Sequence, residues 1–176
     1  MSKLQSPFRY DFVGSFLRPQ EVKDARAAFK EGKITADDLR KIEDTEIAKL
    51  IEKQKKAGYH AITDGEFRRS YWHLDFMWGF NGINEVELDH GYFFHGEETT
   101  HGSIEVVGKI SGENHPFVEH FKYVKLFEDE NTIARQTMPA PAQLLAELFR
   151  EDNGKKTTAV YPNIDELIND IAAAYR

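Results

Sequence analysis

Cysteine is absent from all 176 residues of the chain. The fold therefore cannot depend on disulfide bonds. Long apolar runs are missing as well, because no stretch reaches the roughly 18 residues that a membrane-spanning helix requires. Residues 1–9 also lack the apolar core of a secretory signal. These absences predict a cytoplasmic protein that has no membrane partner.

Basic residues are fewer than acidic ones. The chain has 23 Lys and Arg against 30 Asp and Glu, which gives a formal net charge of −7 and a pI near 5.5. Nucleic-acid binding usually needs a basic patch, so this balance argues against a nucleic-acid partner. With 40% hydrophobic and 30% charged residues, the composition is that of an ordinary globular domain, long enough to bury a core.

Two acids and two arginines lie within residues 64–69, directly after a short apolar strand expected over residues 59–63. The strand follows a helix that is predicted to begin after Thr35 and to end before Gly58. In (β/α) barrels and open α/β sheets, the C-terminal ends of strands hold the active site. This cluster indicates a site for a zwitterionic or anionic substrate. A solvated ion-pair cluster is the alternative.

A second segment of the same kind lies upstream, where an apolar strand expected over residues 12–16 contains Gly14 and Ser15. A helix is predicted over residues 20–30, with Pro19 in its first turn. Gly14 permits close approach of a ligand to the backbone, and the N–H groups around Ser15 suit a carboxylate near a helix start. An ordinary strand-to-helix turn is the alternative interpretation.

Strands and helices alternate along the first half of the chain, which favours a parallel α/β architecture in a single domain. The pattern breaks over residues 80–102, a Gly-rich stretch that predicts a long βα excursion with a hairpin in it. The remaining strands are expected over residues 104–110 and 132–138, the remaining helices over residues 116–127, 142–150 and 165–171, and a polar loop over residues 152–156. Together these elements make about four strand–helix units.

Histidines are the residues that most invite a metal interpretation. His90, His95 and His101 are five and six residues apart, in a segment without helical periodicity. Zinc sites bring together three or four ligands, often at short motif spacing, so a metal site is not expected there. His115 flanks a helix start and is expected at the surface. The aromatic residues after the acidic motif are expected to build core rather than to stack on a ligand.

Several segments, taken together, resemble the cobalamin-independent methionine synthase family. The likeness is closest to the short single-barrel members related to its C-terminal catalytic domain. The segments that carry the resemblance are residues 13–19, 32–35, 43–44, 54, 63–70, 72–76, 108–110, 137–141 and 161–162. They follow the family's order over nearly the whole chain. One difference is Phe12, where many short members carry a histidine.

The resemblance implies a TIM-barrel fold. A complete (β/α)8 barrel takes about 250 residues and rarely fewer than about 200. The chain therefore predicts a partial TIM barrel, the N-terminal half of that domain over residues 1–176. The family's catalytic zinc is bound by His, Cys and Glu ligands that come mostly from the later half of the barrel. Since no cysteine is present, zinc is not expected to be bound by this chain alone.

The resemblance also implies an activity, the zinc-activated methylation of a thiol. Homocysteine or a related thiol would be the substrate, and methyltetrahydrofolate the methyl donor. By matching motif positions, Gly14 and Ser15 would bind the amino acid through backbone and hydroxyl groups. Glu66 and Asp64 would accept hydrogen bonds from its ammonium group.

His73 falls near the substrate pocket in the same resemblance. Its sequence neighbours leave two local roles open, which are a hydrogen bond to Asp75 and packing beside Trp72. The sequence assigns no catalytic residue.

Three functions remain open at this point. The first is part of a zinc-dependent methyltransferase that is inactive as this chain alone. The second is a non-catalytic half-barrel module that self-associates through open sheet edges. The third is a zinc-independent, lyase-type reaction such as decarboxylation, carried by Asp64, Glu66 and Arg68 on a related barrel.

Overall fold

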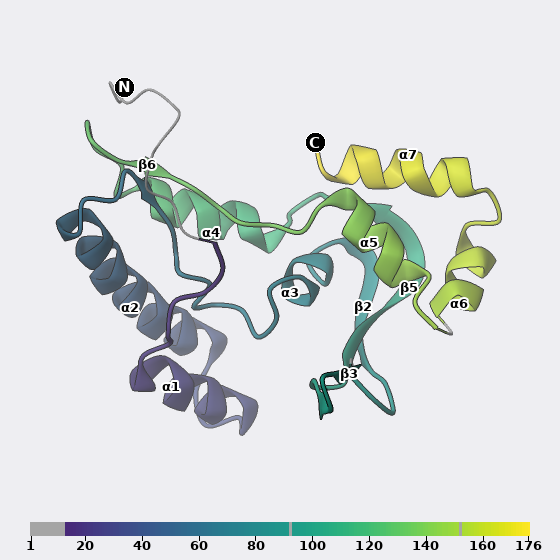
Figure 1. Ribbon diagram of the computed structural model, residues 1–176, viewed down its shortest axis with the longest axis horizontal. Coiled ribbons are helices and arrows are strands. Elements are labelled where there is room, and N and C mark those ends of the chain that lie inside the picture. Colours follow the sequence, from purple (N-terminus) through teal and green to yellow (C-terminus); the bar gives the residue numbers. More distant parts are fainter. Residues whose placement is uncertain (1–12, 92, 152) are drawn as a thin grey trace. The chain divides into compact units, whose positions relative to one another are not determined.

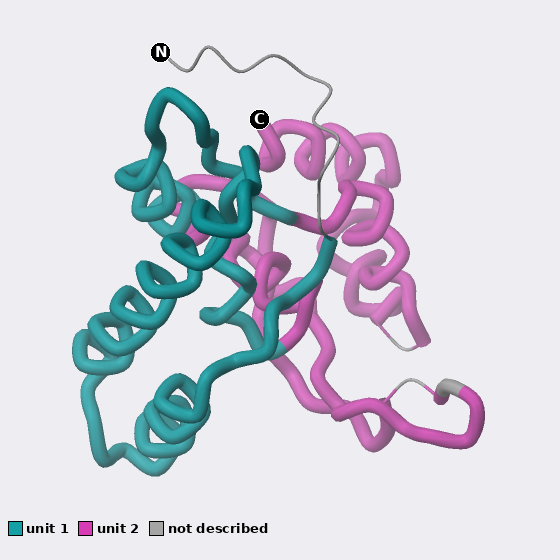
Figure 2. Tube along the Cα trace, turned by 60° about the vertical axis from the view of Figure 1, so that its left-hand side comes forward, with its two compact units in different colours: residues 1–70, 118–137 teal, residues 71–117, 138–176 magenta. Residues whose placement is uncertain are grey.

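The computed structural model describes residues 13–91, 93–151 and 153–176. The chain forms two compact units and passes between them three times (Figure 2). The first unit consists of residues 1–70 and 118–137, and the second of residues 71–117 and 138–176. Each unit has a hydrophobic core of its own.

The first unit begins with a helical hairpin of α1 (Gln20–Lys30) and α2 (Ala36–Lys56), which pack against each other (Figure 1). A capping box starts α2, since the Thr35 hydroxyl accepts a hydrogen bond from Asp38 N while Thr35 N donates to Asp38 Oδ2, both at 3.2 Å. These bonds satisfy backbone donors that the first helical turn leaves without partners. Both helices are confirmed as predicted from the sequence.

One face of α2 is buried along most of the helix. The buried members of the first core are Val22, Ile47, Leu50, Ile51, Ile62, Phe67 and Val124. Glu43 and Gln54 lie at helical spacing before and after the apolar part of this face, and both are buried. The helix thereby brings a carboxylate and an amide to the segment that follows it.

The strands β1 (Ala61–Ile62) and β6 (Ile133–Ala134) form a short parallel pair. Ile133 N donates to His60 O at 2.8 Å, and Arg135 N donates to Ile62 O at 2.9 Å. The helix α4 (Pro116–Lys125) begins in the second unit, continues into the first, and precedes β6 along the chain. Because the two strands are parallel, their C-terminal ends lie at the same edge of the sheet.

An antiparallel ribbon runs through the second unit, where β2 (Asn81–Glu87) pairs with the long curved strand β5 (Gly102–Ser111) (Figure 1). The connection between them contains a smaller hairpin of β3 (Phe93–Phe94) and β4 (Glu97–Glu98). The register shifts at Gly82, whose φ is +80° and where a Cβ would lie 2.4 Å from the facing backbone. Glycine is therefore required at this bulge.

Helices cover the ribbon of the second unit. They are α3 (Leu74–Met77), α5 (Pro141–Leu148), α6 (Asn153–Val160) and α7 (Ile164–Ala174), and each contacts β5. Phe76 and Phe80 are buried between them with an edge-to-face ring contact of 5.2 Å. The prediction that the aromatics after the acidic motif build core is confirmed for these two and wrong for Trp72, which is 55% exposed. In the described part of the chain, no helix combines the length and the hydropathy needed to cross a membrane.

The helices predicted over residues 116–127, 142–150 and 165–171 are confirmed as α4, α5 and α7. The polar loop predicted over residues 152–156 is wrong for residues 153–156, because α6 begins at Asn153. The buried Asn153 amide donates to Ser103 Oγ and to Glu147 O, both at 3.2 Å. A side chain that is typical of loops is here the polar anchor of a helix.

The predicted α/β class is confirmed, whereas the partial barrel is not. Every sheet among the described residues has two strands, and the β1–β6 pair is the parallel one. The strand predicted over residues 12–16 includes Phe12, which lies outside the described residues, and residues 13–16 are not a strand. Gly14 has a φ of +89°, which is incompatible with an extended strand. The excursion over residues 80–102 does contain the predicted hairpin.

Asp129 supplies a pH-dependent contact in the first unit. It accepts hydrogen bonds from Lys55 Nζ at 2.8 Å, from Asn131 N at 2.8 Å and from Thr132 Oγ1 at 2.9 Å. The Lys55 ammonium above all, and then the other two donors, lower the pKa of Asp129 to about 2, below its ordinary value of 3.8. The depressed pKa means that the stabilisation is complete above about pH 4 and is lost as the pH falls toward 2.

We expect Asp129→Asn to lower the free energy of unfolding at pH 7, where the carboxylate is charged. The difference from the unsubstituted chain should shrink as the pH falls from 4 toward 2, because the carboxylate becomes protonated in the folded state. Urea denaturation across this pH range measures it, with the exposed Asp89→Asn as the control. A difference that does not change with pH would contradict this assignment.

Candidate functional site

Two of the predicted segments lie side by side in the first unit. Phe16 N donates to Gly65 O at 3.1 Å, so the segment with Gly14 and Ser15 runs along the turn of residues 64–66. Ser15 is exposed, and no atom lies within 4 Å of the position that a Cβ on Gly14 would take. The fold therefore brings two pairs of predicted site residues together in this unit. Gly14 and Ser15 form one pair, and Asp64 and Glu66, some fifty positions later in the sequence, form the other.

The side chain of Gln54 fixes the backbone at the end of β1. Its Nε2 donates to Thr63 O at 2.9 Å, and its Oε1 accepts from Thr63 N at 3.0 Å, so the amide pairs as a neighbouring strand would. Gln54 is 2% exposed, and these bonds satisfy its amide away from water. The start of the turn is thereby held by α2 rather than by another strand.

The turn itself is built from short local hydrogen bonds. Gly65 N donates to Thr63 Oγ1 at 3.0 Å, and Glu66 N donates to Asp64 Oδ1 at 2.9 Å. Gly65 and Glu66 have φ values of +64° and +59°. A left-handed conformation is strained for glutamate, and strain of this kind persists where the surrounding contacts impose it. One oxygen of Asp64 is therefore used by the turn.

Two arginines bind the carbonyl groups that follow the turn. Arg18 Nη2 donates to Glu66 O at 3.0 Å and to Arg69 O at 2.7 Å. Arg26, on α1, donates to Arg69 O, to Arg68 O at 3.1 Å and, at 3.5 Å, to Phe67 O. Four successive carbonyl oxygens are thus held by two guanidinium groups, because a guanidinium presents several donors in a fixed fork. The same bonds attach the Gly14–Ser15 segment and α1 to the turn.

The Glu66 carboxylate is buried and asymmetrically bound. Glu66 is 6% exposed. Its Oε1 accepts a hydrogen bond from Thr137 Oγ1 at 2.8 Å and lies 3.4 Å from Arg69 Nη1. Arg69 Nη2 also donates to Thr137 Oγ1 at 3.1 Å and to Thr137 O. No partner of Glu66 Oε2 lies among the described residues. Glu66 Oε2 can therefore accept a hydrogen bond from a ligand.

Arg68 serves the fold rather than the site. It pairs with Glu43 at 3.2 Å and with Asp44, and its side chain is 6% exposed. Burial raises the pKa of Glu43, and the Arg68 guanidinium opposes that shift. The guanidinium carbon also lies 5.4 Å from the centre of the Tyr123 ring. Of the two arginines in the acidic motif, Arg68 is thus engaged by structural carboxylates.

His73 belongs to the second unit. Its ring lies 4.5 Å from the ring of Trp72, while Asp75 Oδ2 accepts from Tyr71 N at 2.7 Å. Of the two roles left open by the sequence, packing beside Trp72 is the one observed. Burial lowers the pKa of His73, so the imidazole is neutral at pH 7, and its Nδ1 has no hydrogen-bond partner among the described residues.

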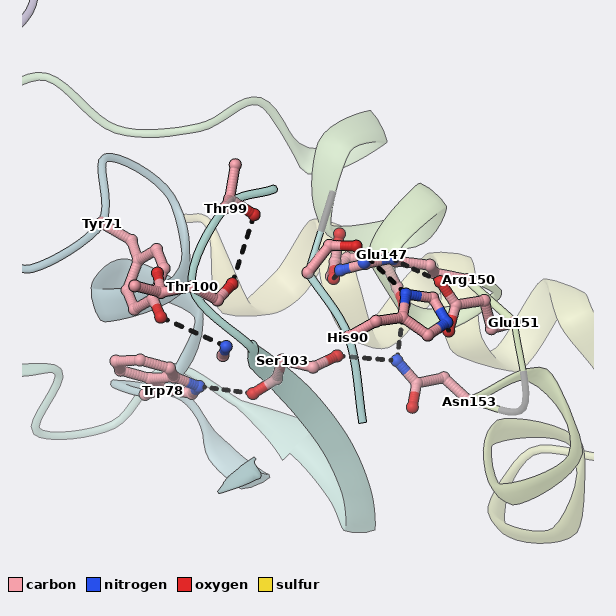
Figure 3. A network of polar contacts seen from close by, with 12 residues as sticks. Tyr71, Trp78, His90, Thr99, Thr100, Ser103, Glu147, Arg150, Glu151 and Asn153 are labelled. Atoms are coloured by element: carbon pink, nitrogen blue, oxygen red, sulfur yellow. Dashed lines mark hydrogen bonds and ion pairs between the residues drawn. The ribbon is translucent and has the colours of Figure 1, made fainter. Parts of the chain in front are cut away.

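A polar network joins α5 and α6 to β5 in the second unit (Figure 3). Trp78 Nε1 donates to Ser103 O at 3.0 Å, and Asn153 Nδ2 donates to Ser103 Oγ at 3.2 Å. Nearby, Arg150 pairs at 3.2 Å with Glu147, which is 1% exposed. These bonds satisfy polar groups inside the unit, so we assign the network to folding.

His115 is buried, so its predicted position at the surface is wrong. Its Nε2 lies 2.9 Å from Phe76 O, and its Nδ1 accepts from Phe117 N at 3.2 Å. A backbone N–H can only donate, so Nδ1 is the acceptor and Nε2 carries the proton of a neutral ring. Burial also lowers the pKa of His115. This is a satisfied core histidine.

The described residues do not fit a zinc ion. No group of three or more His, Cys, Asp or Glu side chains in that part of the chain is arranged to hold a metal. His90 and His101 instead approach carboxylates, Glu151 and Glu98, each at 3.6 Å. The expectation that this chain alone does not bind zinc stays a prediction.

A family model described as "Cobalamin-independent synthase, Catalytic domain" matches residues 10–163. The chain belongs to this family. The match spans both units and includes the Gly14–Ser15 segment, the turn of residues 64–66 and the strand end at Thr137.

The chain spans about half the length of the relatives that it matches over nearly its whole sequence. "Uncharacterized protein YxjH" of Bacillus subtilis is 38% identical over 172 residues, which are 98% of this chain and 44% of that protein. A 5-methyltetrahydropteroyltriglutamate–homocysteine methyltransferase of Neisseria gonorrhoeae is 38% identical over 58 residues, 33% of this chain and 8% of that protein. The crystal structure of a candidate vitamin-B12-independent methionine synthase from Listeria monocytogenes matches with a TM-score of 0.67 and 36% identity, over 96% of this chain and 50% of that one.

Several residues of the site were not singled out from the sequence. Arg18 and Arg26 bind the turn from outside it, and Thr137 reaches it from the neighbouring strand. A signal was present for Thr137, which lies near the C-terminal end of the strand predicted over residues 132–138, much as Asp64 lies at the end of the strand predicted over residues 59–63. No local pattern indicates the two arginines, because their partners are carbonyl groups about fifty positions away.

Gly65 is required by both its backbone angle and its surroundings, since a Cβ there would lie 2.3 Å from Leu50 Cδ2. Gly32 has a similar φ of +70°, with no atom within 4 Å of a Cβ. Gly32→Ala should therefore cost roughly 1 kcal/mol through strain alone. Gly65→Ala should cost a further 1–3 kcal/mol, roughly, through overpacking. Urea denaturation measures the free energy of unfolding of both variants. An equal loss of stability in the two would exclude the close contact with Leu50.

Proposed function

We propose that this chain takes part in the methylation of a thiol amino acid, homocysteine or a related compound, with methyltetrahydrofolate as methyl donor. Its part in the reaction is to bind the amino-acid end of the thiol substrate at the turn of residues 64–66. The observation that carries the proposal is the Glu66 carboxylate, buried at the C-terminal ends of two parallel strands with one oxygen bound and the other without a partner.

A substrate ammonium group is the natural partner of Glu66 Oε2. A charge-assisted hydrogen bond to a buried carboxylate is stronger than one between neutral groups, and it favours a cation over a neutral ligand. Asp64 is the second acceptor of the proposed site, although its Oδ1 already accepts from Glu66 N. The two acids therefore have unequal parts, in which Asp64 shapes the turn and Glu66 binds the ligand.

The carboxylate of the amino acid is assigned to Gly14 and Ser15. Ser15 offers an exposed hydroxyl, and the open space beside Gly14 leaves its backbone accessible. The bond between Phe16 N and Gly65 O holds this segment beside the acidic turn. Opposite charges of one zwitterion would then be bound by two segments that the fold joins directly.

Zinc chemistry is not assigned to this chain. The described residues hold no suitable ligand group, and the sequence has no cysteine. His73 lies in the second unit, and its part in substrate binding stays a prediction. A zinc-independent lyase reaction is less well supported, because Arg68, which that reaction was expected to use, is bound by Glu43 and Asp44.

Titration calorimetry with L-methionine tests the amino-acid site without any need for metal. We expect Glu66→Gln to weaken binding by roughly tenfold or more, the equivalent of a charge-assisted hydrogen bond of about 1.5–3 kcal/mol. Glu52→Gln, at an exposed position of α2, is the matched control and should leave affinity unchanged. Equal affinity of the Glu66→Gln variant, or no binding by the unsubstituted chain, would refute the proposal.

Assembly through a sheet edge is a second candidate function. The outer edge of β6 has no strand partner among the described residues, and Ala134 N there donates to the exposed side chain of Glu128 at 2.9 Å. A charged side chain on a sheet edge is a common means of blocking edge-to-edge pairing. Glu128 would then control whether this edge accepts a strand from another copy of the chain.

Light scattering at micromolar concentration measures the average mass of the protein in solution and so detects self-association. We expect the unsubstituted chain to associate weakly and Glu128→Ala to shift the average mass upward, because the substitution uncovers the Ala134 N–H. Glu119→Ala, which removes an exposed acid that pairs with Lys122 on α4, is the control for lost charge. A monomeric mass for all three proteins would exclude assembly through β6.

A further inference from the structure

Thr137 connects the ends of the two parallel strands. It lies three residues beyond β6, while Glu66 lies four residues beyond β1, and the two side chains meet at 2.8 Å. Thr137 belongs to the first unit, as Glu66 and Arg69 do, so this contact lies within one compact unit. A hydroxyl from one strand end therefore reaches the carboxylate presented by the next.

The direction of these hydrogen bonds is fixed by chemistry. A guanidinium can only donate, so Thr137 Oγ1 accepts from Arg69 Nη2 at 3.1 Å. The hydroxyl proton is then directed to Glu66 Oε1, which can only accept when the carboxylate is ionised. Arg69 is 2% exposed, so this relay is shielded from water. One carboxylate oxygen is occupied, and the rotation of the carboxylate is restricted.

The backbone of Glu66 is held as firmly as its side chain. Its N–H is bound by Asp64 and its carbonyl by Arg18, and its φ is +59°. Since the other polar groups of Glu66 are bound, Oε2 is the atom at which it can accept a further hydrogen bond, and the direction of that bond is fixed. Pre-organisation of this kind raises affinity for the ligand that fits, because little freedom is lost on binding.

We propose that Thr137 is a positioning residue that, together with Arg69, directs Glu66 Oε2 to the ammonium group of the bound amino acid. This inference rests on the proposed function and goes further, because it assigns preference for a charged amino group to a residue outside the acidic motif. The chain should therefore bind an amino acid more tightly than the same molecule without its amino group, and the Thr137 hydroxyl should set part of that difference.

The test compares L-methionine with 4-(methylthio)butanoate, which has the same carboxylate and thioether but no ammonium. Calorimetry gives the ratio of the two affinities for the unsubstituted chain and for Thr137→Val and Thr137→Ser. Valine has nearly the shape of threonine without the hydroxyl, and serine keeps the hydroxyl. We expect Thr137→Val to reduce the ratio roughly three- to tenfold and Thr137→Ser to restore it. A purely structural role would weaken both ligands alike.

Each outcome separates this inference from the function on which it rests. An unsubstituted chain that binds L-methionine no better than the analogue overturns the proposed function, and the role of Thr137 with it. A preference that survives Thr137→Val unchanged overturns the role of Thr137 alone. Should Thr137→Val fail to fold, as judged by circular dichroism, Thr137→Ala carries the same expectation with a smaller side chain.

Discussion

Four carbonyl oxygens in a row, those of residues 66–69, converge on the guanidinium groups of Arg18 and Arg26. This contact allows the chain to keep Glu66 in a left-handed conformation that glutamate rarely adopts. It also fixes the Gly14–Ser15 segment beside the turn, since Arg18 follows that segment closely in sequence. The acidic motif is thus part of a fixed turn whose two carboxylates are buried.

The helices were largely predictable from the sequence, because their signals are local. Thr35 before an apolar period and Pro141 at the start of α5 define helix starts without reference to distant residues. The helix α6 was missed altogether, since its first residue, Asn153, is typical of loops and its amide is buried against Ser103 by a tertiary contact. Burial depends on tertiary contacts that sequence periodicity does not contain.

The strands were predicted less well, for a physical reason. A parallel strand is defined by its neighbours, and β1 and β6 keep only two residues each in ladder pairing. Beyond them, side chains such as Gln54 take over the backbone bonds. The candidate site fared similarly: the acids were found at a strand end, as expected for an α/β protein. Their partners Arg18, Arg26 and Thr137 became visible only once the chain was folded.

The amide of Gln54 has a consequence for how this sheet can grow. In a parallel strand, alternate residues turn their hydrogen-bonding groups to opposite sides, and Thr63 faces away from β6. That side is closed at Thr63 by a buried, neutral amide, whereas on the outer side of β6 the N–H of Ala134 is bound by the exposed carboxylate of Glu128. The edge at Thr63 is therefore blocked by a buried side chain, whereas the exposed side chain of Glu128 at the outer edge of β6 is displaceable. Two copies that met at their displaceable edges would form a closed pair, and this sheet could not propagate into an open fibre.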